Sequence, residues 1–148
     1  MPEPAEETLR IAGDLPFTEP KYGPLRILVA EDHPINQKLL LTMLQKRGYN
    51  ADLVENGRQA LQAVQQQRYD LIFMDVQMPV MSGLTAAALI SDLFTTGSRP
   101  YMVAVTAYAR PEDRERCLAV GMEDFISKPF LASDIERILQ GRQEKISS

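Results

Sequence analysis

Cysteine, positive charge and long apolar runs are scarce in this sequence. The single cysteine, Cys117, cannot form a disulfide within the chain, which suits a reducing cytoplasm. Lys and Arg number 16 against 20 Asp and Glu, so the net charge of -4 gives no sign of nucleic-acid binding. No apolar run approaches a membrane span, and the first residues lack the layout of a signal peptide. We expect a cytoplasmic protein without a nucleic-acid partner and without membrane contact of its own.

The composition changes near both ends of the chain. Residues 1–24 carry five of the ten prolines and several acidic residues, which is typical of a linker or flexible arm. Within this arm, the stretch from Leu9 to Phe17 is apolar enough to dock onto another surface. Residues 141–148 are expected to be a short polar tail with no room for a second domain. The remaining stretch, residues 25–140, is long enough for one domain with a hydrophobic core.

Five short apolar runs rich in β-forming residues alternate with stretches that have helical spacing. The runs are Leu25–Ala30, Ala51–Val54, Leu71–Met74, Tyr101–Val105 and Asp124–Ser127. In the first helical stretch, the apolar residues Ile35, Leu39 and Met43 recur four positions apart. Strands that alternate with helices predict a parallel sheet covered on both faces. The predicted fold class is therefore α/β: a doubly wound, five-stranded parallel sheet with helices on both faces.

Prolines and glycines mark the ends of the expected helices. Prolines stand at first helical positions and glycines where helices stop: Pro34, Pro111, Gly48 and Gly121. Ser133, with Glu136 three residues later, predicts a capping box that opens the last helix. These signals agree with the alternation of strands and helices.

In a doubly wound sheet, functional side chains gather beyond the carboxyl ends of the strands. The polar residues at those ends are Glu31, Asp32, Asp75, Thr106 and Lys128. Each one alone has an ordinary explanation, because Asp forms turns, Thr suits strands and Lys is usually solvated. As a set, three carboxylates at one edge repel one another and raise each other's pKa. A hard divalent cation with oxygen ligands, usually Mg²⁺, removes this cost.

These residue types also predict phosphoryl transfer. A carboxylate can act as a nucleophile toward phosphorus and form an aspartyl phosphate. Phosphoryl transfer needs positive charge on the phosphoryl oxygens, which Mg²⁺ and Lys128 can supply. The hydroxyl of Thr106 can bind a remaining oxygen after the transfer.

Four segments carry a resemblance to a known family. They are Ile27–Asp32, Asp70–Pro79, Val105–Ala107 and Ser127–Phe130. With these segments, about three quarters of the chain resembles the receiver domain of two-component response regulators. The resemblance implies a flavodoxin-like sheet with the strand order 2-1-3-4-5. Residues 32–37 and 74–79 further resemble receivers fused to hybrid histidine kinases, so the chain is expected to be either a stand-alone receiver or part of such a kinase.

The resemblance implies that Asp75 is the phosphoacceptor. Asp75 would take a phosphoryl group from a histidine kinase or a histidine phosphotransfer domain. Thr106 and Lys128 would contact the phosphoryl oxygens, and the Lys128–Pro129 bond would be cis, which is affordable only before proline. A receiver promotes its own phosphorylation and hydrolysis without turning over an external substrate, so we expect a signalling switch.

The resemblance also implies a Mg²⁺ site. Asp32 and Asp75 would bind the ion directly, together with the backbone carbonyl of Gln77. Glu31 would hold a metal-bound water. The predicted cofactor is therefore Mg²⁺, bound by residues from two strand ends.

Three further residues have both a functional and an ordinary explanation. Phe125 stands where the family has an aromatic residue that turns inward when Thr106 moves toward the phosphoryl group, although an ordinary core Phe is as good an explanation. Tyr108 either overhangs the site and shields it from water or is an exposed loop residue. His33, the only histidine, is best explained as a loop residue that caps the helix at Pro34 and not as a phosphorylated histidine.

Other classes of protein remain as alternatives. A flavodoxin-type cofactor protein needs a phosphate-binding loop after the first strand, but here that loop is acidic and lacks glycine. An aspartate-nucleophile phosphatase has its nucleophile after the first strand in an Asp-x-Asp arrangement, which differs from Glu31-Asp32. A pseudo-receiver that only binds proteins is disfavoured by the complete set of five polar residues.

Overall fold

Five parallel strands form the centre of the protein. A computed structural model of the chain describes residues 19–94, 98–107 and 110–147. The strands are β1 (Ile27–Ala30), β2 (Asp52–Val54), β3 (Leu71–Asp75), β4 (Tyr101–Thr106) and β5 (Asp124–Ser127). Their order is β2-β1-β3-β4-β5, and every neighbouring pair is parallel. This order confirms the predicted flavodoxin-like sheet.

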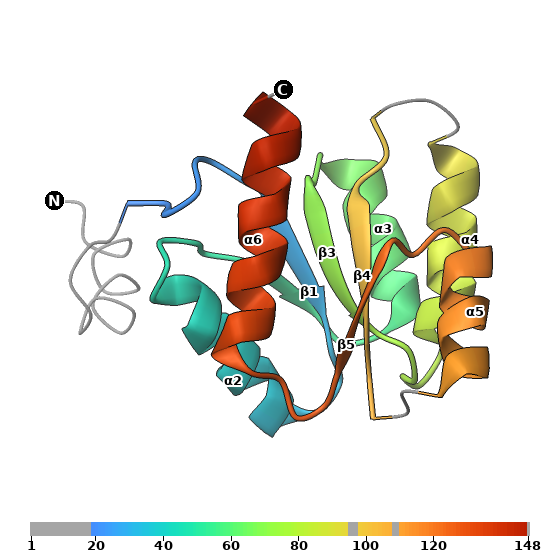
Figure 1. Ribbon diagram of the computed structural model, residues 1–148. Coiled ribbons are helices and arrows are strands. Elements are labelled where there is room, and N and C mark those ends of the chain that lie inside the picture. The colour runs from blue at the N-terminus through green and yellow to red at the C-terminus, as the bar shows by residue number, and fades with distance from the viewer. Residues whose placement is uncertain (1–18, 95–97, 108–109, 148) are drawn as a thin grey trace, which may run out of the picture.

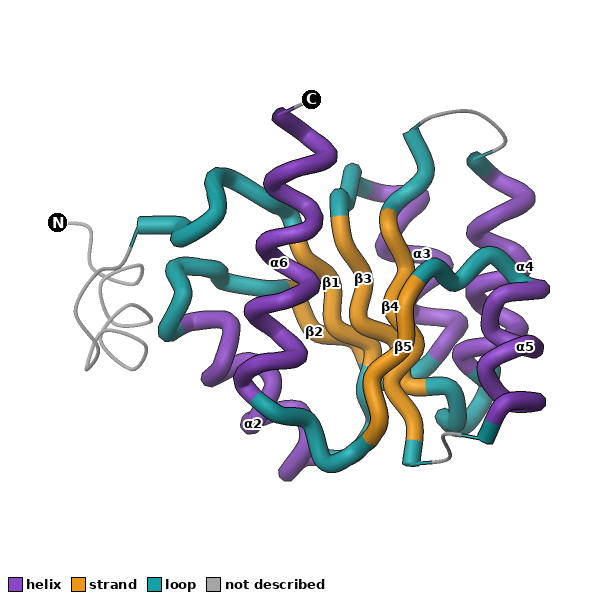
Figure 2. The backbone as a smooth tube through the Cα atoms, in the orientation of Figure 1, coloured by secondary structure: helices purple, strands orange, loops and turns teal. Residues whose placement is uncertain are grey.

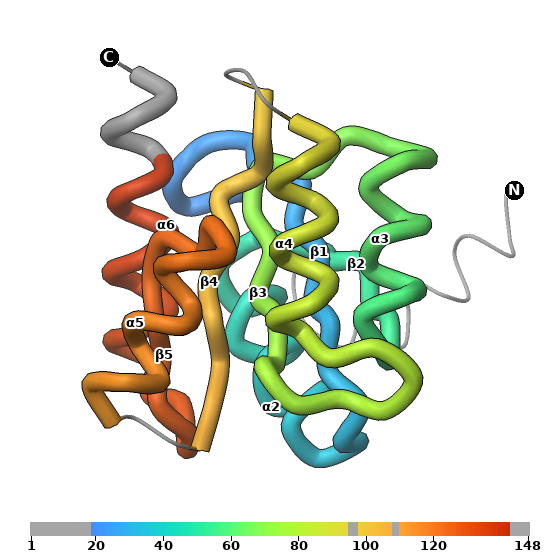
Figure 3. Tube along the Cα trace, turned by 90° about the vertical axis from the view of Figure 1, so that its right-hand side faces the viewer, coloured from blue at the N-terminus to red at the C-terminus, as the bar shows by residue number. Residues whose placement is uncertain are grey.

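Helices cover both faces of the sheet. They are α2 (Pro34–Gln45), α3 (Gly57–Gln66), α4 (Gly83–Leu93), α5 (Pro111–Ala119) and α6 (Ala132–Ser147). Helices α2 and α6 lie on one face, and α3, α4 and α5 lie on the other (Figure 1). Figure 2 shows the strands between these two layers, and Figure 3 shows α4 between α3 and α5. In the part of the chain that the structure describes, no helix is long and apolar enough to cross a membrane.

The period of two along each strand divides the interior into two cores. In β1, Ile27 and Val29 pack in the core under α2 and α6, whereas Leu28 and Ala30 pack in the core under α3, α4 and α5. All five residues of β3 are buried. Burial of each large apolar side chain contributes about 1.5–3 kcal/mol, so the central strands are firmly held. They provide a rigid base for the residues at their carboxyl ends.

The predicted helix signals are confirmed at α2 and α5. Pro34 and Pro111 occupy the first helical positions, where the missing N–H has no intrahelical partner to lose. Gly48 and Gly121 follow these helices with φ angles of 89° and 97°. This left-handed region strains a residue that carries a Cβ atom, which explains the glycines. His33 occupies the N-cap position of α2 in extended conformation, but its side chain forms no capping hydrogen bond.

The predicted capping box at the last helix is wrong. Helix α6 begins at Ala132, so Ser133 lies inside its first turn. The carboxylate that caps the start of this helix is that of Asp134, not Glu136. Its Oδ2 accepts a hydrogen bond from the backbone N–H of Leu131 at 3.0 Å. Glu136 points elsewhere and binds the segment that precedes β1. The helix thus begins two residues earlier than the sequence signal indicated, and it continues to Ser147 through the residues assigned to the tail.

Residues directly before β1 are fixed against α2 and α6. Lys21 Nζ lies 3.1 Å from Glu136 Oε1, and Arg47 Nε lies 2.5 Å from Glu136 Oε2. The hydroxyl of Tyr22 donates a further hydrogen bond to Glu136. The hydrogen bond from Tyr22 and those from Arg47 and Lys21 lower the pKa of Glu136 to about 2. The arm boundary at residue 24 stays a prediction, and the apolar stretch from Leu9 to Phe17 lies outside the described residues.

Candidate functional site

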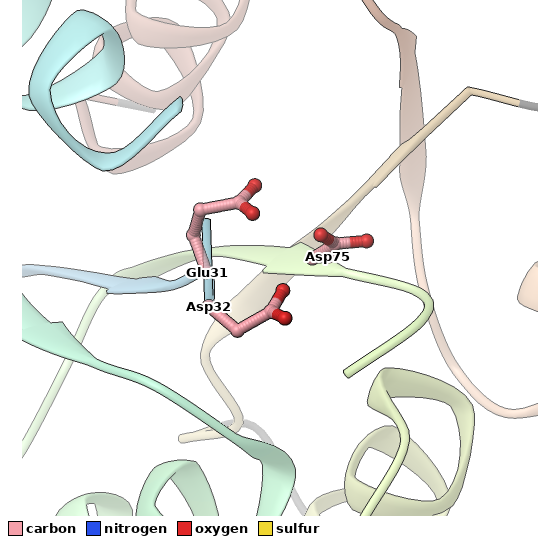
Figure 4. A group of neighbouring side chains, drawn as sticks. All are labelled: Glu31, Asp32 and Asp75. Atoms are coloured by element: carbon pink, nitrogen blue, oxygen red, sulfur yellow. The ribbon is translucent and has the colours of Figure 1, made fainter. Parts of the chain in front are cut away.

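The acidic residues predicted at the strand ends lie together at the carboxyl edge of the sheet, the lower edge in Figure 1. Because β1 and β3 are adjacent, Glu31 and Asp32, which follow β1, stand beside Asp75 at the end of β3. One carboxylate oxygen of each residue lies within 4.8 Å of the other two. Figure 4 shows the three side chains turned toward a common space. The three carboxylates therefore form one cluster, as the sequence predicts.

Lys128 supplies positive charge to this cluster. Its Nζ donates a hydrogen bond to Asp75 Oδ2 at 2.9 Å and lies 3.3 Å from Glu31 Oε1. The other oxygen of Asp75, Oδ1, accepts a hydrogen bond from the backbone N–H of Gln77 at 3.0 Å. Each oxygen of Asp75 thus has one donor, which fixes the orientation of the carboxylate. One cation faces three carboxylates, so the cluster keeps an excess of negative charge.

Burial makes this excess charge costly. Glu31 and Asp75 are only 2% and 5% exposed, whereas Asp32 is exposed. Burial, and next the charge of Asp75, raise the pKa of Glu31 from 4.5 to about 7, although the His33 N–H and Lys128 oppose the rise. Burial lowers the pKa of Lys128, but the hydrogen bond and charge of Asp75 and the charge of Glu31 outweigh it, so that this pKa is raised. A divalent cation would relieve the repulsion that lifts the pKa of Glu31.

The backbone around the cluster is closely packed. A Cβ atom on Gly83, the first residue of α4, would lie 2.0 Å from the carbonyl oxygen of Asp75, so only glycine fits there. The backbone N–H of Glu31 donates to Val54 O at 3.0 Å, and that of Lys128 donates to Thr106 O at 2.8 Å. These contacts hold the loops after β1, β3 and β5 against the sheet. The predicted cis bond before Pro129 is also present.

Two of the predicted site residues lie inside their strands. Asp75 and Thr106 were expected after β3 and β4, but both still take part in the sheet pairing and end these strands. Thr106 is 4% exposed at the same edge as Asp75. Its contact with a phosphoryl group, and the ligand role of the Gln77 carbonyl, stay predictions. Tyr108 lies outside the described residues.

Phe125 lies in the core under α3, α4 and α5. The guanidinium carbon of Arg114 lies 5.0 Å from the centre of its ring, a contact that no pattern in the sequence predicts. Cys117 borders the hollow that Phe125 lines, and it also borders a cavity of ≈ 250 Å³ beside Thr106. Thr106 and Phe125 thus border two separate hollows, and Cys117 lines both of them.

Apolar side chains around the cluster were missed by the sequence analysis. Ile35, Val80 and Leu131 are 71%, 74% and 59% exposed. They follow the polar residues of three different strand ends within a few positions, and we call them the apolar rim. The sequence signal was an apolar residue shortly after each polar strand end, but Ile35 was interpreted as part of a buried helix stripe. Exposed apolar groups around a polar centre are typical of a protein-binding surface.

Residues 27–140 match the family described as the response regulator receiver domain. The chain belongs to this receiver domain family. This receiver domain is 42% identical over 128 residues to Histidine protein kinase 1 of Candida albicans and 37% identical over 125 residues to Hybrid signal transduction histidine kinase I of Dictyostelium discoideum. Each alignment covers 80% of this chain but only 5% and 7% of the two relatives. The chain is therefore far shorter than these kinases.

Solved structures agree with this family. The receiver domain of the sensor histidine kinase PA1611 from Pseudomonas aeruginosa is 40% identical, with a TM-score of 0.74 that covers 82% of this chain and 99% of the other. That structure has a magnesium ion coordinated in its active site cleft. A second solved structure is the Saccharomyces cerevisiae complex of the histidine phosphotransfer protein Ypd1 with the receiver domain of Ssk1. The matched chain in that complex is 30% identical to this one, with a TM-score of 0.73, and the match covers 83% of this chain and 88% of that chain.

Proposed function

We propose that Asp75 accepts a phosphoryl group from the phosphohistidine of a histidine kinase or a histidine phosphotransfer protein, and that Mg²⁺ is required. The observation that carries this proposal is the buried carboxylate of Asp75, which is held 2.9 Å from the ammonium of Lys128 and beside two further carboxylates. An isolated buried carboxylate would become protonated and lose its nucleophilicity. The ammonium of Lys128 places a positive charge against the buried carboxylate of Asp75 and offsets part of the cost of burying it.

In the proposed step, an oxygen of Asp75 attacks the phosphorus atom. The new O–P bond forms as the P–N bond to the imidazole breaks, and the imidazole leaves with the electron pair and takes a proton from solvent. Lys128 is close enough to move from the carboxylate to an oxygen of the transferred group, where its charge stabilises the transition state. Thr106, buried at the next strand end, would donate its hydroxyl to another oxygen.

The carboxylate cluster fits a hard divalent cation. Mg²⁺ prefers oxygen ligands and keeps several waters, and Glu31, Asp32 and Asp75 offer three carboxylates within 4.8 Å. We assign Asp32 and Asp75 as direct ligands with the backbone carbonyl of Gln77, and Glu31 as the residue that holds a metal-bound water. When bound, the ion supplies positive charge to the phosphoryl oxygens. The magnesium-bound relative from Pseudomonas aeruginosa supports this assignment.

The same site would act as a conformational switch. When Thr106 turns toward the phosphoryl group, Phe125 would turn inward, and Cys117, which lines both the hollow at Phe125 and the cavity of ≈ 250 Å³ beside Thr106, lies next to both. A phosphoryl group that contacts only one of the two packings shifts the population toward it. If Phe125→Ala left the response of a partner to phosphorylation unchanged, this switch would be rejected.

The apolar rim would receive the donor protein. Ile35 lies in the first turn of α2, and Val80 and Leu131 lie on the loops after β3 and β5, so a partner that covers these three residues also reaches Asp75. The yeast complex, in which a histidine phosphotransfer protein binds a receiver domain, supports a partner of this class. Whether the chain acts alone or within a hybrid kinase, and its cytoplasmic location, remain predictions.

Mass spectrometry of the intact chain tests the phosphoacceptor. After incubation with Mg²⁺ and acetyl phosphate, we expect a gain of one phosphoryl mass that is labile to hydroxylamine. Asp75→Asn should abolish the gain, whereas Asp92→Asn, an exposed aspartate of α4, should keep it. A gain that persists in Asp75→Asn refutes the assignment. No gain, together with no effect of Mg²⁺ on the melting temperature, would favour the pseudo-receiver instead.

A second experiment separates donor binding from chemistry. Leu131→Glu should slow transfer from a phosphorylated histidine phosphotransfer protein at least tenfold, because it buries a charge in the interface. Phosphorylation by acetyl phosphate, which needs no docking, should not change. Leu118→Glu is a matched control, since Leu118 on α5 is equally exposed at 59% but lies away from the rim. Equal effects of both substitutions would exclude the apolar rim as the docking surface.

A further inference from the structure

A second polar hollow lies at the opposite end of the sheet. It opens at the amino ends of the strands, the upper edge in Figure 1, beside the late turns of α6. Its volume is ≈ 200 Å³, where a single water needs only about 10–15 Å³. The residues around it are Arg68, Tyr69, Asp70, Ser98, Arg99, Tyr101, Glu123 and Arg142. We call it the arginine pocket, because three guanidinium groups line it.

Two of these guanidinium groups lack acceptors. Arg142 stacks on the ring of Tyr101, with its guanidinium carbon 3.3 Å from the ring centre. Its Nε is buried and has no hydrogen-bond partner. Among the residues that the structure describes, neither Arg142 nor Arg68 forms an ion pair or donates a hydrogen bond. A buried donor without an acceptor is destabilising, so the pocket favours a ligand that brings acceptor oxygens.

The two carboxylates of the pocket do not fill this need. Asp70 Oδ2 accepts a hydrogen bond from the backbone N–H of Arg26 at 2.8 Å. Glu123 Oε1 accepts one from Met102 N at 3.3 Å, and its Oε2 lies 3.7 Å from Arg99. Each carboxylate is thus already engaged by a neighbour. Among the described residues, neither carboxylate accepts a hydrogen bond from Arg68 or Arg142, so the guanidinium N–H groups of these two residues can donate to a ligand.

We propose that the arginine pocket is a second ligand site, which binds the phosphate or carboxylate group of a small molecule. Guanidinium forks match the paired oxygens of both groups. The ring of Tyr101 holds Arg142 in a fixed orientation, so that little side-chain entropy is lost when an anion binds. Tyr101 begins β4 and Thr106 ends it, so the pocket lies roughly 16 Å from the carboxylate cluster along the strand. An anion in the pocket is therefore separate from a phosphoryl group on Asp75.

Residue-resolved NMR of the ¹⁵N-labelled chain tests the site. The chain is titrated with sodium phosphate and, separately, with sodium citrate, and sodium chloride at matched ionic strength is the blank. We expect saturable shifts of the amides of Tyr69, Asp70, Tyr101 and Arg142 with at least one of the two probes and not with chloride. Response to only one probe identifies which oxyanion the pocket takes. Absence of saturable shifts with both probes at millimolar concentrations overturns the proposal.

Substitutions decide whether the guanidinium groups bind the anion. Arg142→Met should weaken binding about tenfold or more, as expected for loss of a hydrogen bond to a charged group. Arg68→Met, at an exposed position that cannot disturb folding, should also weaken it. Arg137→Met is the matched control, because Arg137 lies on the same helix but pairs with Asp124 outside the pocket. Shifts that survive both Arg142→Met and Arg68→Met, or that occur only around Asp75 and Lys128, overturn the proposal.

Discussion

Neutralisation of Glu31 should change how the stability of the metal-free protein depends on pH. Burial and the charge of Asp75 raise the pKa of Glu31 from 4.5 to about 7 in the folded chain. Unfolding exposes the carboxyl group to water, where its ordinary pKa returns. The folded state therefore holds a proton that the unfolded state releases between these two values. Because the folded pKa is the higher one, the stability contribution is complete below pH 4.5 and is lost as the pH rises through 7.

The size of this loss follows from the two pKa values. At about 1.4 kcal/mol per pKa unit, the difference between 4.5 and about 7 corresponds to about 3.5 kcal/mol. Most of it falls between pH 5 and 8, and Glu136, whose pKa is lowered to about 2, does not titrate in that window. A loss of this size is a large fraction of the 5–15 kcal/mol that typically stabilise a domain. It is therefore well within the reach of an unfolding experiment.

Urea unfolding in the presence of EDTA is the assay. The free energy of unfolding of the unsubstituted chain should fall by about 2–3 kcal/mol from pH 5 to pH 8, and Glu31→Gln should remove most of this fall. Glu115→Gln, the same change at an exposed position of α5, should leave the fall intact. If Glu31→Gln and Glu115→Gln have the same pH dependence as the unsubstituted chain, the explanation by Glu31 is refuted.

Three shorter predictions concern stability and the backbone of the site. Phe73→Ala, in the fully buried centre of β3, should lower the free energy of unfolding by about 3–5 kcal/mol in urea. Gly83→Ala places a Cβ atom 2.0 Å from the carbonyl oxygen of Asp75 and should slow phosphorylation by acetyl phosphate. Gly141→Ala, in contrast, adds a Cβ atom with no neighbour within 4 Å and should stabilise α6 by up to about 1 kcal/mol. Asn56→Ala removes the side-chain cap of α3 and should cost about 1 kcal/mol, measured by thermal unfolding.

The sheet and the carboxylate cluster were predictable because both depend on strand periodicity. The strands β1, β3 and β4 are runs of mainly apolar residues buried on both faces, and in a parallel sheet all carboxyl ends meet at one edge. Glu31, Asp75 and Lys128 therefore had to converge once the strands were recognised. The strand order itself came from the family resemblance, since periodicity does not specify which strands are neighbours.

Side-chain partners over long sequence distances were not predictable. Glu136 looked like a capping residue because Ser133 stands three positions before it, but tertiary contacts with Lys21 and Tyr22 determine its direction. Ile35 fits the helical spacing of a buried stripe, yet it lies beyond the end of the sheet, where nothing in the described part of the chain covers it. Local patterns specify the element, whereas the packing around it decides which of its faces is buried.

The strain in the carboxylate cluster has a direct consequence for metal binding. The carboxyl group of Glu31 has a pKa of about 7, and it must lose its proton before it can interact favourably with a bound cation and its waters. Mg²⁺ should therefore stabilise the chain more at pH 8 than at pH 5, and its binding should release a proton near neutral pH. The repulsion between Glu31 and Asp75, which destabilises the metal-free fold, is relieved by the ion and so adds to its affinity. Replacement of Glu31 by Gln would make the metal-free fold more stable at pH 8 and the Mg²⁺ complex weaker, and both effects come from the same charge.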